Sequence, residues 1–310
     1  MNLPYDPKIL HLEVSTHCNA KCPQCERNIN GGMINPAVKV QHMATSDFEA
    51  ILGEHRTYLE KVLFCGNAGD PMMHPDIVRM LDYARLVCEK PITLGMNTNG
   101  SIGNAEQWQD IASVMTSIKD YVVFSIDGLE DTNHLYRKGT NWRTIMRNAE
   151  AFIRAGGSAH WDFLVFNHNQ HQVEQAEQLA RDMGFRWFRV KETKRFKQPE
   201  IRTAFNTVLK PVEFRPRPTE YQSIRCMAQE ESSTYYDVQG HHYACCWVAS
   251  AENLNESWGR PFRNLPWEQL ERQWDHRDLA HPCTRTCGQL SGTNVYKNQW
   301  RREVEFDAVQ

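Results

Sequence analysis

Apolar positions along the first 191 residues form two alternating patterns. Short runs rich in β-branched and aromatic residues, typical of strands, cover residues 9–14, 61–64, 92–96, 121–126, 161–166 and 187–190. Between them, apolar residues recur every three or four positions, as in amphipathic helices, over residues 46–57, 75–88, 105–116, 143–155 and 170–183. The first of these helices opens on Ser46-Asp47-Phe48-Glu49, which indicates a capping box. Strands alternating with helices of this length predict βα units around a parallel sheet.

The pattern changes after residue 191. Residues 192–225 are rich in proline and basic side chains, and we expect them to form a bridge. The basic residues are typical of a solvated surface, or they line an opening that attracts an anionic substrate. Residues 226–310 carry five of the ten cysteines, with short strands expected around residues 235–243. We therefore predict an α/β domain over residues 1–191, the bridge, and a small C-terminal domain over residues 226–310.

Composition narrows the class of protein. Hydrophobic residues make up 41% of the 310 residues and charged residues 24%, as in a globular protein with a sizeable core. The net charge of −3 gives no electrostatic case for binding nucleic acid or an anionic membrane. The chain has no apolar run of about 20 residues and no secretory leader, so we expect a cytoplasmic protein. In that compartment ten cysteines predict metal ligands rather than disulfides.

Three cysteines stand close together directly after the first predicted strand: Cys18, Cys22 and Cys25. Thiolates favour iron–sulfur clusters or zinc over hard cations. Three thiolates can hold three irons of a cubane cluster and leave the fourth iron open to a small molecule. The alternatives are a zinc knuckle or unconnected buried thiols.

The Cys-x3-Cys-x2-Cys spacing after a first strand resembles the signature of the radical S-adenosylmethionine (SAM) enzymes. The resemblance implies a partial (β/α)6 TIM barrel, open on one side, whose [4Fe–4S] cluster binds SAM. Reductive cleavage of SAM would then give a 5′-deoxyadenosyl radical that takes a hydrogen atom from the substrate. Gln24 stands where this family usually has an aromatic residue, and the resemblance implies a contact with SAM there, largely through the backbone.

Further motifs follow the second predicted strand. The run from Phe64 to Pro71 contains Gly66-Asn67-Ala68-Gly69-Asp70, which resembles the Gly-Gly-Glu motif of the same family. Ala68 replaces the first glycine and Asp70 replaces the glutamate. The resemblance implies that Gly69 and Asp70 hold the α-ammonium group of SAM through charge-assisted hydrogen bonds. Taken alone, a Gly-Asp-Pro sequence indicates only a turn.

The next three strands also end in candidate SAM contacts. Asn97-Thr98-Asn99-Gly100 is similar to the Thr-Asn-Gly strand end of the family and implies a role for Asn97. By the same resemblance Ser125 would contact the ribose or the carboxylate of SAM. Arg137 would pair with the carboxylate, a task that suits a guanidinium. Asn167, after the fifth strand, is a further candidate.

A second set of cysteines lies near the C-terminus. Cys226 is followed by thirteen residues, Gly240, four residues and Cys245, and the chain later reads Cys283-Thr284-Arg285-Thr286-Cys287. This arrangement resembles the twitch or SPASM extensions of radical SAM enzymes, in which a β-hairpin carries the first two cysteines. The resemblance implies one auxiliary [4Fe–4S] cluster on Cys226, Cys245, Cys283 and Cys287. Cys246 is a rival for Cys245, and structural zinc on four cysteines is the alternative.

These resemblances cover about residues 9–290 and imply an enzyme. We expect SAM cleavage and a net two-electron oxidation of a small molecule, with the auxiliary cluster accepting an electron and a flavodoxin or ferredoxin as reductant. The first strand is expected near residue 9, which leaves no room for the leader-binding domain of many peptide-modifying members. A ribosomally made peptide delivered by a separate partner is an alternative substrate. An iron–sulfur electron carrier and a zinc-stabilised binding module are alternatives outside the enzymes.

Overall fold

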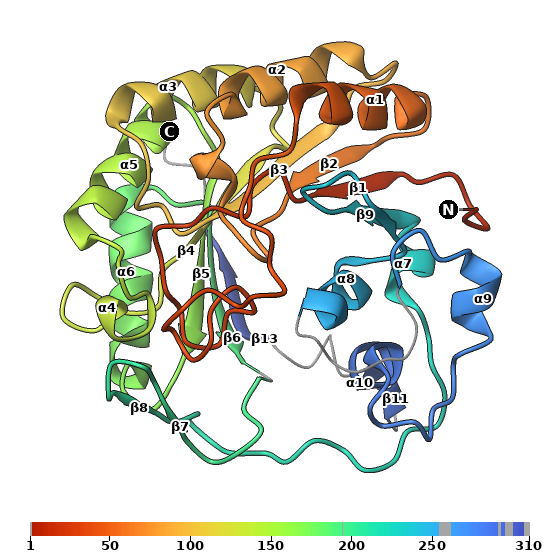
Figure 1. Ribbon diagram of the computed structural model, residues 1–310. Helices are drawn as coiled ribbons and strands as arrows, with labels where there is room; N and C mark the ends of the chain where they lie inside the picture. The colour runs from red at the N-terminus through yellow and green to blue at the C-terminus, as the bar shows by residue number, and fades with distance from the viewer. Residues whose placement is uncertain (1, 194, 254–261, 291–292, 295–299, 307–310) are drawn as a thin grey trace.

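The computed structural model describes residues 2–193, 195–253, 262–290, 293–294 and 300–306 (Figure 1). A nine-stranded sheet runs in the order β10-β9-β1-β2-β3-β4-β5-β6-β13. Its six central strands pair in parallel, each with the next along the chain. They are β1 (Ile9–Leu12), β2 (Lys61–Phe64), β3 (Thr93–Thr98), β4 (Tyr121–Ser125), β5 (Ala159–Val165) and β6 (Trp187–Glu192). This architecture confirms the predicted α/β class and is consistent with a partial TIM barrel.

Helices follow the parallel strands and cover one face of the sheet. The long helices are α1 (Thr45–His55), α2 (Ile77–Val87), α3 (Ala105–Val114), α5 (Trp142–Arg154) and α6 (Val173–Met183). The shorter elements η1 (Pro71–Met73), α4 (Asn133–Tyr136) and η2 (Gln170–Gln172) lie in the connections. Each predicted helix of the first 191 residues is therefore present within a few residues of its predicted range.

The capping box predicted at the start of the first helix is wrong. Helix α1 begins at Thr45, so Ser46 lies inside the first turn instead of at the N-cap. The N-cap is Ala44, whose side chain makes no capping hydrogen bond. Its carbonyl oxygen accepts from the backbone nitrogens of Asp47 (3.0 Å) and Phe48 (3.1 Å). A serine hydroxyl caps a helix from the N-cap position, where it accepts from the N–H of the second or third helical residue, and Ser46 lies beyond that position.

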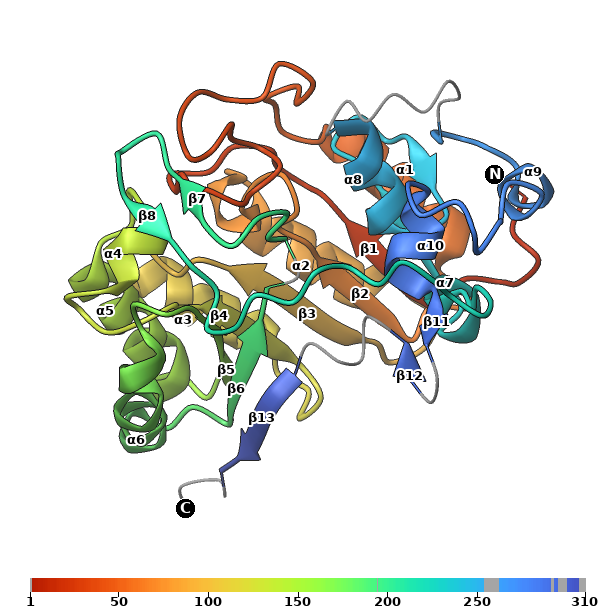
Figure 2. The same ribbon diagram turned by 90° about the horizontal axis from the view of Figure 1, so that it is seen from below.

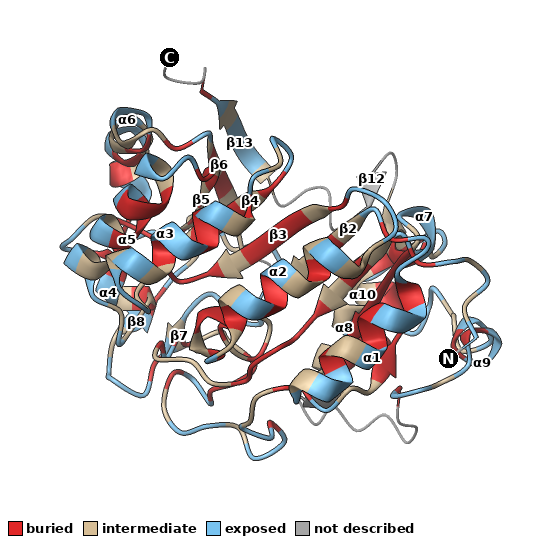
Figure 3. Cartoon of the chain, turned by 90° about the horizontal axis from the view of Figure 1, so that it is seen from above, coloured by how far each residue is buried: buried red, intermediate tan, exposed pale blue. Residues whose placement is uncertain are grey.

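Alternation along the strands separates a buried face from a half-buried one. Residues such as Phe64, Phe124, Trp161 and Phe188 are buried in the main core, packed with residues of the helices. Figure 3 shows buried residues, in red, along the central strands and on parts of the helices that cover them. The intervening strand residues are only half-buried, because they point to the face without the helix layer. The open face therefore carries several polar and charged side chains beside apolar ones such as Leu63 and Leu164.

The residues after 192 complete both edges of the sheet. Strand β9 (Ser233–Tyr236) pairs in parallel with β1, and β10 (His242–Tyr243) pairs antiparallel with β9. Strand β13 (Trp300–Glu305) runs antiparallel to β6 at the other edge. The short strands expected around residues 235–243 thus form, but as part of the main sheet.

The rest of this region is short elements gathered beside β1, as Figure 2 shows from below. They are α7 (Met227–Glu230), α8 (Cys246–Asn253), α9 (Trp267–Glu271), α10 (Pro282–Cys287), and the pair β11 (Gln289–Leu290) and β12 (Thr293–Asn294). A hairpin of β7 (Ile201–Arg202) and β8 (Val208–Leu209) lies in the bridge. In the described part of the chain, no helix has the length and apolar character needed to cross a membrane.

Candidate active site

The first three cysteines lie together in the loop that follows β1. Cys22 is buried, Cys18 and Cys25 are half-buried, and all three pack into one small cluster with Tyr136 and Phe166. Burial raises the pKa of Cys25 to about 12 and raises the pKa of Cys18 and Cys22 as well. Thiols in such surroundings keep their protons until a cation compensates the thiolate charge. Metal binding here would therefore release protons.

Each of these cysteines is contacted by a residue from a different part of the sheet. Asn99, directly after β3, places its side-chain nitrogen 3.6 Å from Cys18 Sγ. Asn67, in the loop after β2, has its carbonyl oxygen 3.7 Å from Cys25 Sγ. Arg137, after α4, places Nη1 3.9 Å from Cys22 Sγ. Three successive connections of the barrel thus meet at the cysteine loop, at the end of the sheet where ligands of parallel α/β proteins collect.

Glu13 holds the loop after β2 in position. Its buried carboxylate accepts from the backbone nitrogens of Asn67 (2.9 Å) and Ala68 (3.2 Å) and from the Tyr235 hydroxyl (3.1 Å). Burial, reinforced by the charge of Glu26, raises the pKa of Glu13 to about 8. Glu13 was not among the site residues predicted from the sequence. A glutamate within a run otherwise predicted as a buried strand was the available signal, since isolated buried carboxylates are rare.

Gly69 lies where only glycine fits. A Cβ atom at this position would stand 1.9 Å from the carbonyl oxygen of Ser15. The next residue, Asp70, donates its backbone N–H to the carbonyl oxygen of His17 at 2.9 Å. The loop after β2 therefore lies directly against the chain that leads into the cysteine loop.

The side chain of Asp70 ties this loop to the end of β3. Its buried carboxylate accepts from Thr98 Oγ1 (3.0 Å), from the backbone nitrogen of Asn99 (2.8 Å) and from that of Met72 (3.1 Å). Burial raises the pKa of Asp70 to about 6 against the effect of these hydrogen bonds. The observed contacts give Asp70 an organising role within the protein, beside the ammonium contact that the resemblance implies.

Arg137 is held by a carboxylate that the sequence analysis did not select. Its Nε lies 2.5 Å from Asp127 Oδ2, and the Asp127 side chain is completely buried. The second oxygen of Asp127 accepts from the backbone nitrogen of Leu164 at 2.7 Å. Burial raises the pKa of Asp127, and the positive charge of Arg137 opposes that shift. Asp127 is therefore a positioning residue for the guanidinium beside Cys22.

The other residues predicted to contact SAM differ in their burial and in their hydrogen-bond partners. Neither polar atom of the buried Gln24 amide has a hydrogen-bond partner among the described residues. Asn97 and Ser125 are half-buried residues near the ends of β3 and β4. Asn167 is exposed, and its hydrogen bonds go to Gln170 and Lys210, so the structure does not bring it to the cysteines.

These observations fit a [4Fe–4S] cluster, the group that the three-cysteine motif implies. Three thiols in one loop are the ligand set for three irons of a [4Fe–4S] cluster. The amide of Gln24 is a buried polar group free to bond a ligand. Within the described ranges, no three His, Cys, Asp or Glu side chains are arranged around a position for one metal ion. A cubane cluster separates its thiolates more widely than a single ion does, because each thiolate binds a different iron.

The structure also brings together the four late cysteines selected from the sequence. Cys226 precedes α7, Cys245 precedes α8, and Cys283 and Cys287 lie on α10, which packs against α8. A hydrogen bond from Cys287 lowers the pKa of Cys226 to about 7. The pKa of Cys283 is raised by burial and by the nearby thiols of Cys245 and Cys226.

Cys246 packs in the same cluster as this group but also makes a contact outside it. Its side chain hydrogen-bonds to Asn67, the residue whose carbonyl oxygen contacts Cys25. It also lies near Cys65, at the end of β2. Cys246 therefore stands between the two sets of cysteines. Cys88 is half-buried at the end of α2 and belongs to neither set.

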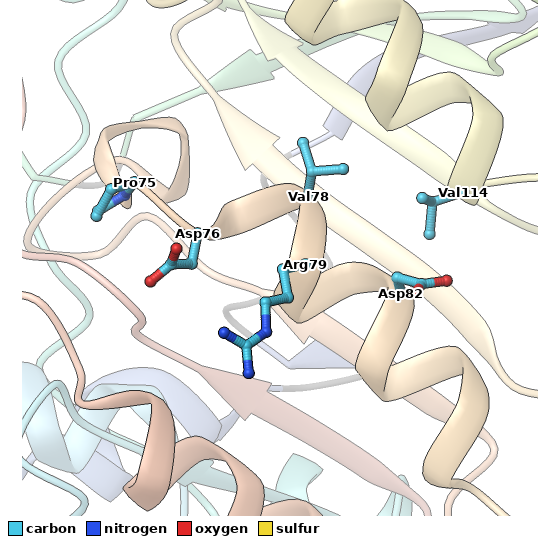
Figure 4. A pocket seen from close by; sticks show the side chains of 6 residues that line it. All are labelled: Pro75, Asp76, Val78, Arg79, Asp82 and Val114. Atoms are coloured by element: carbon cyan, nitrogen blue, oxygen red, sulfur yellow. The ribbon is translucent and has the colours of Figure 1, made fainter.

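Figure 4 shows a pocket on the helix layer, lined by Pro75, Asp76, Val78, Arg79, Asp82 and Val114. These residues belong to α2, to the turn before it and to the end of α3. None of them is a cysteine or a residue that contacts one. This pocket is therefore separate from the candidate active site.

Comparisons with known proteins bear on the family of this chain. The sequence model of the Radical SAM superfamily matches residues 12–183. The "Tungsten-containing aldehyde ferredoxin oxidoreductase cofactor-modifying protein" of Pyrococcus furiosus is 27% identical over 140 residues, which are 43% of this chain and 34% of that protein. The match thus spans about a third of that relative's length.

Solved structures share the fold at low identity. The structure of anSMEcpe with bound AdoMet has a TM-score of 0.59 and 14% identity, over 87% of this chain and 78% of that chain. SuiB of Streptococcus suis, bound to precursor peptide SuiA, has a TM-score of 0.56 and 13% identity, over 87% and 65% of the two chains. The family match extends over more than half of the 310 residues and includes the three-cysteine loop and the strand-end motifs. The chain therefore belongs to the radical SAM superfamily of enzymes.

Proposed function

We propose that this enzyme binds a [4Fe–4S] cluster on Cys18, Cys22 and Cys25, cleaves SAM reductively and abstracts a hydrogen atom from a small molecule. The observation that carries the proposal is the convergence of three strand connections on the thiols of Cys18, Cys22 and Cys25. When bound, the cluster and SAM supply the electron and the radical of the family's chemistry. The protein supplies position, charge and protection from water.

The residues around the thiols stabilise their ionised form. The side-chain amide of Asn99 and the guanidinium of Arg137 direct N–H groups towards the sulfurs of Cys18 and Cys22. Hydrogen bonds of this kind to cluster sulfurs raise the reduction potential, because they stabilise added negative charge. Asp127 keeps the guanidinium in place for this task.

SAM would lie beside the same loop. We assign its contacts to Gln24, Gly69, Asp70, Asn97, Ser125 and Arg137. The unpartnered amide of Gln24 supports the first of these assignments. Asn167 is the weakest member of the predicted set, because its observed partners are Gln170 and Lys210.

We assign an auxiliary [4Fe–4S] cluster to Cys226, Cys245, Cys283 and Cys287. The packing of α8 against α10 and the hydrogen bond between Cys287 and Cys226 support this set. Cys245 is favoured over Cys246, because the side chain of Cys246 is engaged by Asn67. Four thiolates would leave no iron for substrate, so the auxiliary cluster would accept an electron from the substrate in a net two-electron oxidation.

Two substrate classes remain in competition. The name of the Pyrococcus furiosus relative, a cofactor-modifying protein, favours a small molecule. The complex of SuiB with its precursor peptide supports a peptide delivered by a partner as the second candidate. We place the small molecule first and the peptide second. A flavodoxin or ferredoxin is the proposed reductant.

The test is anaerobic iron and sulfide content together with 5′-deoxyadenosine formation. We expect about eight irons in the wild type and about four in the triple variant Cys18→Ala, Cys22→Ala, Cys25→Ala, which should cleave no SAM. Cys88→Ala is the matched control and should retain both properties. SAM cleavage by the triple variant, or zinc in place of iron at both sites, would overturn the proposal.

A further inference from the structure

The face of the sheet without the helix layer carries an unusual set of side chains. Beside the apolar Leu63 and Leu164, half-buried positions of this face on β2, β4, β5 and β6 hold charged and aromatic residues: Lys61, Tyr121, His160, Asp162, Trp187, Arg189 and Lys191. The residues that alternate with them are apolar and buried in the main core. Half-buried charges are costly unless they are paired or bind a ligand. The composition of this face therefore calls for an explanation beyond packing.

Two aromatic rings stack at the end of this face where the strands begin. The rings of Tyr121 and His160 lie parallel, 4.9 Å apart at an angle of 3°, and Lys61 Nζ lies 4.7 Å from the centre of the Tyr121 ring. Burial and the charges of Arg189, Arg186 and Lys61 lower the pKa of His160 to about 3. The imidazole is therefore neutral, and its Nδ1 has no hydrogen-bond partner in the described part of the chain.

The cations Arg189 and Lys191 lie further along β6, towards its C-terminal end. Arg189 Nε and Nη2 lie 2.7 and 2.6 Å from Asp162 Oδ1, and Lys191 Nζ lies 3.7 Å from Asp162 Oδ2. The Trp300 ring of β13 packs over both cations, 5.0 Å from Arg189 Cζ and 4.4 Å from Lys191 Nζ. Each of these aromatic rings has two faces, so a planar ligand could stack on the face that is not already in contact with a neighbouring side chain.

Positive charge is in excess at this place. Burial and the nearby guanidinium groups of Arg189 and Arg195 lower the pKa of Lys191, against the effect of Asp162. Glu303, opposite Arg189 in the ladder, is exposed, while Arg186 and Glu305 pair with each other. The cations Lys61, Arg189, Lys191 and Arg195 thus face the carboxylates of Asp162 and Glu303. An anion would relieve the repulsion among the cations.

The cationic face is continuous with the candidate active site. Ser125, Asp162 and Arg189 are direct neighbours in register across β4, β5 and β6. Arg195 donates from Nη1 to the carbonyl oxygen of Gln24 at 2.8 Å, next to Cys25. A molecule bound on this face would therefore reach the strand ends where the cysteine loop lies.

We propose that this face binds the substrate, a planar aromatic molecule that carries a phosphate group. The phosphate would lie against Arg189 and Lys191, and the ring against Trp300 or the Tyr121–His160 stack. A phosphate monoester brings close to two negative charges at neutral pH, which suits an excess of cations. This inference rests on the proposed function and gives it a substrate class.

Calorimetric titration of the protein as purified tests the proposal without turnover. The probes are GMP, guanosine and benzoate. We expect GMP to bind with a Kd of about 1 mM or tighter, and guanosine and benzoate to bind at least about tenfold more weakly. Lys191→Gln, Arg189→Gln and Trp300→Leu should each weaken GMP binding about tenfold, while Arg202→Gln, on the exposed β7, should leave it unchanged.

The possible outcomes separate the two proposals. Absence of GMP binding, equal binding by wild type and Lys191→Gln, or benzoate binding as tight as GMP binding would each overturn the phosphate site. Far-ultraviolet circular dichroism checks the fold of each variant. Lys191→Gln should keep the iron content of the wild type, because it contacts no cysteine. Conversely, if the proposed SAM chemistry is wrong, the iron and 5′-deoxyadenosine measurements fail while GMP binding persists.

Discussion

At the scale of single residues, buried polar side chains decide how the cysteine loop is held. Glu13, Asp70 and Asp127 are each buried, and each accepts hydrogen bonds from the loops that surround the thiols. A buried carboxylate without partners would cost several kcal/mol, so each position strongly restricts its neighbours. Substitutions of these three carboxylates should therefore change the geometry of the candidate active site while leaving the proposed iron ligands in place.

Glu13→Gln should loosen the loop after β2. The amide can accept only through one atom, so the backbone N–H of Asn67 or Ala68 would face an N–H2 group. We expect a loss of about 1–3 kcal/mol in the free energy of unfolding and weaker SAM binding in the reconstituted enzyme. Thermal unfolding and equilibrium dialysis measure these effects. Glu54→Gln, on the exposed side of α1, is the control and should change neither.

The same variant should alter the pH dependence of stability. The folded protein holds the pKa of Glu13 at about 8, above its ordinary value of 4.5, so between these values the folded state binds more protons than the unfolded state. The contribution of Glu13 is therefore fully present below about pH 4.5 and is lost as the pH rises through 8. Between pH 6 and 8, the melting temperature of Glu13→Gln should fall less steeply than that of the wild type. Parallel curves would contradict this assignment.

Arg137→Lys should weaken SAM binding about tenfold or more. A lysine keeps the charge but lacks the planar fork that lets Arg137 contact Asp127 and Cys22 at the same time. This change avoids leaving the buried Asp127 without a cation, which would cost about 3–5 kcal/mol. Equilibrium dialysis with SAM gives the measurement, with the exposed Arg143→Lys as control. Unchanged affinity would remove Arg137 from the site.

At the scale of elements, the edges of the sheet depend on strands that are distant in sequence. Strand β9 extends the β1 edge and β13 covers β6. An uncovered edge exposes unpaired backbone groups to other chains. Strand β13 also brings Trp300 over the cations of β6. It therefore both covers the edge of the sheet and contributes a ring to the proposed substrate face.

Val304→Asp should therefore detach β13. Val304 pairs with Phe188 and packs against the main core, and a carboxylate there would be partly desolvated. We expect a loss of about 2 kcal/mol in stability and weaker GMP binding, because Trp300 would leave the face. Chemical denaturation and calorimetry test this, and Leu86→Asp on the exposed side of α2 should be neutral. Wild-type stability of Val304→Asp would show that the β6–β13 pairing contributes little.

At the scale of the whole molecule, the two cysteine sets approach each other through α8. Cys245 lies with the late cysteines, and Cys246 hydrogen-bonds to Asn67 beside Cys25. We expect Cys245→Ala to lose about four irons and Cys246→Ala to lose none. Iron and sulfide analysis distinguishes them. The opposite result would make Cys246 the ligand.

Local patterns predicted most of the barrel. Strand β2 occupies the predicted range of residues 61–64, and the other central strands begin or end within a few residues of theirs. These elements follow from the period of apolar positions, which is a property of neighbouring residues. The end of β3 differs from its predicted position, because the strand continues to Thr98. Asn99 is therefore the first residue after the strand, and it contacts Cys18. The sequence motif had instead indicated Asn97 as a contact of SAM.

The α/β architecture and the three-cysteine motif follow from local sequence, because both depend on residues close together in the chain. Contacts between side chains that are distant in sequence arise only in the folded molecule. Glu13 and Tyr235 meet across more than two hundred residues, as do Glu26 and Ser250. The pairing of β13 with β6 and the row of Ser125, Asp162 and Arg189 arise only when the sheet has formed. Such contacts depend on strand order and register, which no local pattern specifies.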